Sequence, residues 1–98
     1  MTKDPKFLQA KIGVTENLDA IQMTLNRCVS EGMIDYESAY YNELNDLLED
    51  VHIVKTWDEL IEIITLAKTL EIDIDTWLSI HGRTSISLIW PTKDSFTI

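Results

Sequence analysis

The chain has 98 residues, of which 45% are hydrophobic and 26% are charged, and these proportions are typical of a folded protein rather than a disordered one. Its formal net charge of −9 excludes a general attraction to nucleic acid phosphates or anionic membranes. The only cysteine leaves no internal disulfide, and no apolar run approaches the roughly 20 residues that span a bilayer. We therefore expect a cytoplasmic protein with a single domain over residues 1–98.

The N-terminal region is expected to be a loose arm followed by a helix. Pro5 and Gly13 both discourage an early helix, so the arm is assigned to residues 1–13. The first helix is predicted over about 16–31, and Gly32 is placed to end it in a left-handed turn. An apolar stripe marks its buried face: Leu18, Ile21, Leu25 and Cys28.

The second helix, predicted over about 36–51 with Asp35 as its cap, separates apolar from acidic residues. Its apolar face comprises Tyr36, Tyr40, Leu44, Leu47, Leu48 and Val51. The opposite arc carries four acids with no base among them: Glu43, Asp46, Glu49 and Asp50. Acids near a helix C-terminus oppose the macrodipole, and no Lys or Arg stands at i±3 or i±4 to offset the last three. Such a violation of local preference can mark a functional site.

The third helix is predicted over about 57–70, where Thr56 and Glu59 form a capping box ahead of an apolar-rich run. Apolar residues cover more than half of its circumference. A face this wide indicates a central element with neighbours on two sides.

The C-terminal region is predicted to be a small antiparallel sheet. Apolar and polar residues alternate over 71–80 and again over 84–90, with Gly82 in the turn between them, and 95–98 supplies a third short strand. The fold class is therefore α+β, with three helices followed by a β-hairpin or meander packed on the third helix. The alternative is a mostly α fold, in which Asp75 caps a short helix over 75–81.

The residues that most often perform catalysis or bind metals are sparse. Cys28 lies in an apolar stripe and is expected to be buried rather than nucleophilic. His52 and His81 are too few and too far apart for a zinc site. The alternating acids of 71–75 lack the glycine and the closing glutamate of a calcium loop. We expect no catalytic residue, metal or cofactor, and no enzymatic activity.

Residues 67–78 contain spaced apolar residues around an aspartate: Ala67, Leu70, Ile72, Asp75, Trp77 and Leu78. This pattern resembles the closing helices of phage-repressor-like helix-turn-helix domains, which implies a transcription-related role. Glu71 stands where such turns carry glycine, however, and the net charge opposes DNA binding. Direct nucleic-acid binding is not expected, and a regulator or DNA mimic is kept as an alternative.

The main functional hypothesis follows from the position of the charge. Residues 31–62 contain ten acids and a single base, Lys55. This concentration predicts a regulatory interaction module (an adaptor, inhibitor or immunity-type protein) that docks a basic protein partner. The predicted contact residues are the four acids of the second helix and Trp77, which the strand assignment exposes.

Two further expectations concern the C-terminal region. A small-ligand-binding protein is the second alternative, with His81, Arg83 and Ser85 as its candidate residues. A homodimer through an unpaired sheet edge is also considered, because exposed strands pair readily.

Overall fold

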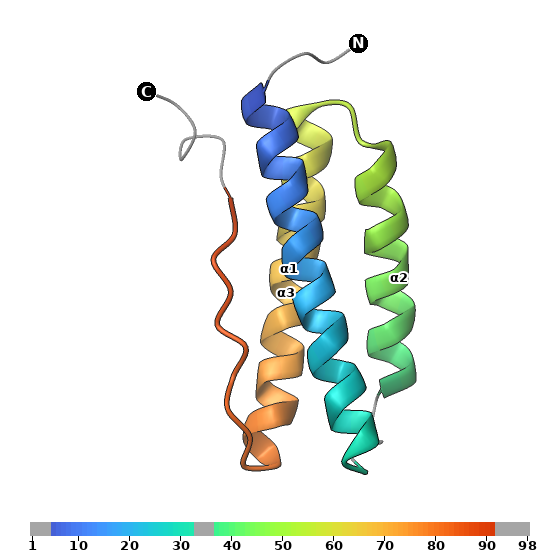
Figure 1. The fold of residues 1–98 in the computed structure, drawn as a ribbon, viewed down its shortest axis with the longest axis vertical. Helices are drawn as coiled ribbons and strands as arrows, with labels where there is room; N and C mark the ends of the chain where they lie inside the picture. Colours follow the sequence, from blue (N-terminus) through green and yellow to red (C-terminus); the bar gives the residue numbers. More distant parts are fainter. Residues whose placement is uncertain (1–4, 33–36, 92–98) are drawn as a thin grey trace.

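The computed structural model describes residues 5–32 and 37–91, which form a bundle of helices. Three helices pack beside one another, as Figure 1 shows: α1 (Pro5–Ser30), α2 (Glu37–Ile53) and α3 (Trp57–Ile80). After α3 the chain turns back, and residues 83–91 run along the side of the bundle antiparallel to α3 (Figure 1). We call this extended segment the strap.

The predicted β-sheet is wrong, because no β-strand occurs within residues 5–32 and 37–91. Residues 71–80 belong to α3, and the strap replaces the strand predicted over 84–90; residues 95–98 lie outside the described ranges. The mostly α alternative fits, although its short helix over 75–81 is the last part of α3. A homodimer through a sheet edge loses its structural basis in the described part of the chain.

The helix α1 begins at Pro5, so residues 5–13 are helical rather than a loose arm. Proline suits the first position of a helix, because its fixed φ is helical and no N–H is needed there. The apolar stripe also extends further toward the N-terminus than predicted, because Phe7, Ala10 and Val14 are buried. Their burial outweighs the cost of about 1 kcal/mol for Gly13 within a helix. The predicted burial of the stripe from Leu18 to Cys28 is confirmed.

The helix α2 runs to Ile53, slightly beyond its predicted end, and its proposed cap Asp35 lies outside the described residues. Leu44, Leu47 and Val51 are buried against the other helices. The Nζ atom of Lys11 on α1 donates to the carbonyl oxygen of His52, 3.1 Å away. A cation from another helix therefore occupies the C-terminal end of α2, where the helix dipole favours positive charge.

The helix α3 begins with the predicted capping box, which is confirmed. The N–H of Glu59 donates to Thr56 Oγ1 at 3.2 Å, and Glu59 Oε1 accepts from the N–H of Lys55 at 3.2 Å. The first of these bonds satisfies a backbone donor that the first turn leaves without an intrahelical partner. Within the described ranges, neither α3 nor another helix is both long and apolar enough to cross a membrane.

The helix α3 continues through residues 71–80 because the helical spacing buries the larger apolar side chains of this segment. Leu70, Ile74, Trp77 and Leu78 follow i, i+4, i+7 and i+8 and are all at most 3% exposed. The helix does not bury every apolar residue of the period-two pattern, because Ile72 remains 62% exposed. No glycine or proline lies between Trp57 and His81 to interrupt the helix.

Glycines in the left-handed region end both α1 and α3, as predicted for Gly32, whose φ is 89°. At Gly82, with φ of 71°, the backbone forms a Schellman motif. The N–H of Arg83 donates to the carbonyl of Leu78 at 2.8 Å, and the N–H of Gly82 donates to that of Ser79 at 3.0 Å. This turn directs the strap back along α3.

The strap keeps the predicted alternation of side chains, but its partner is a helix rather than another strand. Ile86 and Leu88 are half-buried and Trp90 is buried, whereas the residues between them are exposed. The N–H of Ile86 donates to Asp75 Oδ1 at 2.8 Å, and that of Leu88 donates to Glu71 Oε2 at 2.9 Å. Four residues of helix rise about 6 Å and two extended residues span about 6.6 Å, so the two spacings match.

The strap is also attached to α1. The side chain of Asn17 donates to the carbonyl oxygen of Ile89 at 2.8 Å. Pro91 lies beside Gly13, where an added Cβ would be 3.8 Å from Pro91 Cγ. The strap therefore lies along both α1 and α3.

Candidate functional site

The four acids predicted as a docking surface share one exposed surface of α2. We call Glu43, Asp46, Glu49 and Asp50 the α2 acidic face, and all four side chains are exposed. The buried Leu44, Leu47 and Val51 turn the opposite side of the helix toward the core. None of the four acids forms an ion pair with a described Lys, Arg or His. The structure thus places these carboxylates together on the surface, without counter-charges from residues 5–32 or 37–91.

A groove between the end of α2 and the start of α3 adjoins the α2 acidic face through Asp50. We call it the α2–α3 groove, and its volume is about 200 Å³. Its lining combines acids with aliphatic side chains: Asp50, Ile53, Val54, Glu59, Glu62, Ile63 and Leu66. Ile53 is 69% exposed and Leu66 is 46% exposed, so two large apolar side chains lie open to solvent among three carboxylates.

Two hydrogen bonds fix the position of the Glu59 carboxylate in the wall of the groove. The carboxylate accepts the N–H of Lys55 and the hydroxyl of Thr56. The hydrogen bond from the Lys55 backbone, followed by that from the Thr56 side chain, lowers the pKa of Glu59 below its ordinary value. Glu59 therefore stays ionised at neutral pH, with its side chain fixed by the capping box.

Sequence reasoning assigned Glu59 only to the capping box and did not select Glu62, Ile53 or Leu66. A partial signal was present, because both glutamates belong to the acidic stretch 31–62. The groove itself depends on how α2 packs against α3, which no pattern within one helix reports.

Trp77, the fifth predicted contact residue, is not on an exposed surface. The side chain is 3% exposed and packs edge-on against Tyr40, with ring centroids 5.7 Å apart. Its indole nitrogen is buried and has no hydrogen-bond partner within the described part of the chain. The predicted exposure of Trp77 is wrong because it depended on the strand over 71–80, and as part of α3 this residue faces the core.

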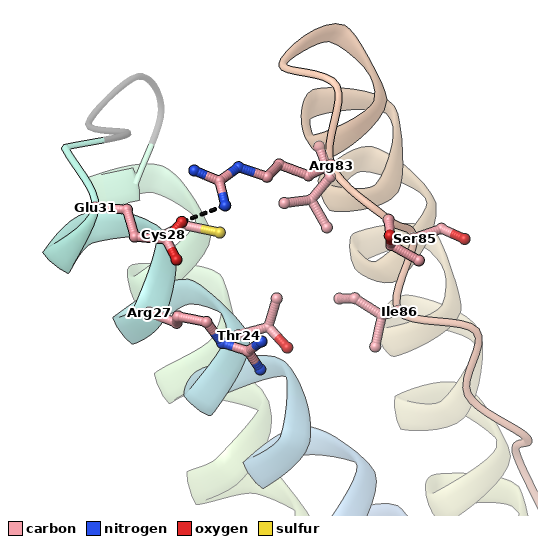
Figure 2. A pocket seen from close by; sticks show the side chains of 9 residues that line it. Thr24, Arg27, Cys28, Glu31, Arg83, Ser85 and Ile86 are labelled. Carbon is pink, nitrogen blue, oxygen red and sulfur yellow. Dashed lines mark ion pairs between the residues drawn. The ribbon is translucent and has the colours of Figure 1, made fainter.

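Two of the three ligand-binding candidates lie together. Arg83 and Ser85 line a cavity of about 380 Å³ between the end of α1 and the start of the strap, shown in Figure 2. The guanidinium group of Arg83 reaches across to an ion pair with Glu31, the residue that follows α1 (Figure 2). His81 does not line this cavity, and its ring packs edge-on against Trp77 instead. Other lining residues from α1, which sequence reasoning did not select, are Thr24, Arg27 and Cys28.

Cys28 lies in the wall of this cavity, but its thiol is shielded. The side chain is only 5% exposed, and desolvation raises the pKa of the thiol above its ordinary value, against the opposing charge of Arg83. No histidine lines the cavity to act as a base for it. A protonated, buried thiol is a poor nucleophile.

We expect Cys28 in the folded protein to react with a thiol reagent at neutral pH at least about 100-fold more slowly than in urea, because reaction requires local opening. The rate of reaction with an aromatic disulfide reagent measures this. A matched control moves the only cysteine to the exposed last residue of α1, as Cys28→Ser with Ser30→Cys, which should react rapidly without urea. Equal rates for the two folded proteins would contradict the burial of Cys28.

Comparisons with known proteins do not assign this chain to a group. No protein-family model, curated protein or solved structure matches it. Within residues 5–32 and 37–91, no cluster of three or more His, Cys, Asp or Glu side chains could hold a metal ion. The α2 acidic face, the α2–α3 groove and the cavity beside Arg83 are therefore the remaining candidate sites.

Proposed function

We propose that this protein is an interaction module that docks a basic partner protein through the α2 acidic face. The observation that carries the proposal is the set of four exposed carboxylates on one side of α2, none of which pairs with a described cation. Asp46 and Asp50 are four residues apart and Glu43 is three residues before Asp46, which are spacings that bring helix side chains close together. Such like-charge pairs destabilise a free helix by a few tenths of a kcal/mol each, and a basic partner would relieve this repulsion.

The acidic surface extends beyond α2, which supports docking rather than a local charge effect. Glu59 and Glu62 of α3 line the groove beside Asp50. The surface therefore draws charge from two helices, and an extended field of one sign accelerates association with a partner of the opposite sign.

The test compares capture by three immobilised proteins in a lysate of the source cells. The wild type should retain a basic protein that moderate salt releases, because salt screens charges on exposed surfaces. The variant with Asp46→Lys and Asp50→Lys should lose it, with an association rate at least about tenfold lower for the purified pair. The matched control, Glu16→Lys with Asp19→Lys, reverses two exposed charges on α1 and should still bind.

Two results would contradict the proposal. Equal retention by all three proteins would show that the partner binds elsewhere. If none retains a basic protein, the acids of α2 serve only to keep the protein hydrated.

A further inference from the structure

The α2–α3 groove offers an apolar contact surface in addition to charge, and this narrows the kind of partner. Ile53 and Leu66 are more exposed than core packing requires, and they lie on opposite walls, one from α2 and one from α3. Exposed aliphatic side chains enclosed by polar residues are typical of binding grooves. The groove volume of about 200 Å³ exceeds the ~150 Å³ of a cavity that admits benzene, so one branched aliphatic side chain fits.

The charges around the groove lie on both of its sides. Asp50 belongs to the α2 wall, and Glu59 and Glu62 belong to the α3 wall. No described Lys or Arg contributes to the lining, although the charge of nearby Lys55 also acts on Glu59. A partner that fits must therefore carry positive charge on both sides of an apolar stripe.

A basic amphipathic helix meets this requirement, because its apolar stripe is flanked by polar residues on both sides. An extended segment fits less well, because the one extended segment among the described residues, the strap, binds α3 through a spacing of carboxylates that the groove lacks. The strap is held by carboxylates four residues apart, Glu71 and Asp75, each of which accepts a backbone N–H. In the groove the two acids of α3 are three residues apart, and Glu59 Oε1 already accepts bonds from the start of its own helix.

We propose that the α2–α3 groove receives an amphipathic helix of the basic partner, with one leucine-sized side chain inserted between Ile53 and Leu66. Basic residues on the two sides of that helix face Asp50 on one wall and Glu62 on the other. This inference rests on the proposed function and adds the apolar anchor and the secondary structure of the partner to it.

The experiment uses two synthetic peptides as probes of the full chain. The first is a helix of about 18 residues that is rich in Lys and Ala, with leucines at i, i+3 and i+7 in one stripe. The second has the same composition and charge, but its leucines are spread around the helix. Each peptide is titrated into the isotope-labelled protein at low salt, and the chemical shifts are followed by NMR.

The amphipathic peptide is expected to bind at least about tenfold more tightly than the rearranged one, because only its stripe buries apolar surface. The methyl signals of Ile53 and Leu66 should shift on its addition. Replacing both by serine should lower its affinity to that of the rearranged peptide. Both side chains are exposed, so this variant should fold normally. A matched control, Met23→Ser with Ile72→Ser, changes two other exposed apolar residues and should leave the affinity unaltered.

The outcomes separate this inference from the proposed function. If both peptides bind with equal affinity and this affinity depends on Asp46 and Asp50, the α2 acidic face is supported as a docking surface and the apolar anchor is wrong. If the amphipathic peptide binds more tightly but shifts signals away from the groove, the anchor is also wrong. If neither peptide binds, the anchor is wrong as well. The capture experiment in the lysate then tests separately whether the α2 acidic face docks a partner.

Discussion

Replacing Trp90 with alanine is expected to lower the free energy of unfolding by about 3 kcal/mol, the lower end of the range for large aromatic residues in cores. Trp90 is the most buried residue of the strap, at 8% exposed, and it packs into the hydrophobic core. Its indole N–H also donates to Glu71 Oε1 over 3.4 Å. Loss of this side chain removes both the apolar contact and that bond, so the strap should detach from α1 and α3.

Urea denaturation measures the loss of stability, and limited proteolysis measures the release of the strap, because cleavage requires exposed backbone. The matched control is Ile89→Ala, which alters the neighbouring residue of the same strap. Ile89 is 91% exposed, so its replacement should change the unfolding free energy by less than about 0.5 kcal/mol. Similar losses of unfolding free energy for the two variants would contradict the alternation of buried and exposed side chains along the strap.

The second large effect is expected from the two carboxylates that hold the strap backbone. Replacing both Glu71 and Asp75 by alanine should cost about 2–3 kcal/mol, because each removal leaves a partly buried N–H without its acceptor. The amide hydrogens of Ile86 and Leu88 should then exchange with solvent much faster than in the wild type. Hydrogen exchange followed by NMR reports the two positions separately.

A conservative pair of substitutions separates hydrogen bonding from charge. Glu71→Gln with Asp75→Asn removes the same two negative charges but retains a carbonyl oxygen at each position. This variant should keep most of the stability and of the exchange protection. If it is destabilised as much as the alanine variant, the acids act through their charge and not as acceptors for the strap.

The local signals in the sequence predicted the middle of each helix and some of the ends. The capping box of Thr56 and Glu59 and the left-handed Gly32 are confirmed, because both features depend on residues a few positions apart. The exposure of the α2 acidic face followed from the helical period alone. In contrast, the exposed position of Trp77 was wrong because it depended on the type of element assigned to 71–80.

The error over 71–80 has a definite physical origin. Residues at 70, 74, 77 and 78 have helical spacing, while the same stretch also alternates with period two. Neither pattern is decisive in isolation. The segment forms a helix because a helix buries Ile74 and Trp77 against the other helices. It also leaves Glu71 and Asp75 beside the strap.

The sequence by itself determined the helical periodicity of residues 16–31, of α2 and of the first part of α3, the position of the capping box, and the concentration of acids in the middle third. The periodicity and the capping box depend on neighbours within about four residues, and the concentration of acids is a matter of composition, so the order of amino acids is sufficient. Only the tertiary structure decided that the strap pairs with a helix and that Asp50, Glu59 and Glu62 meet around Ile53 and Leu66. Contacts between distant segments depend on the packing of whole helices, which a local pattern does not encode.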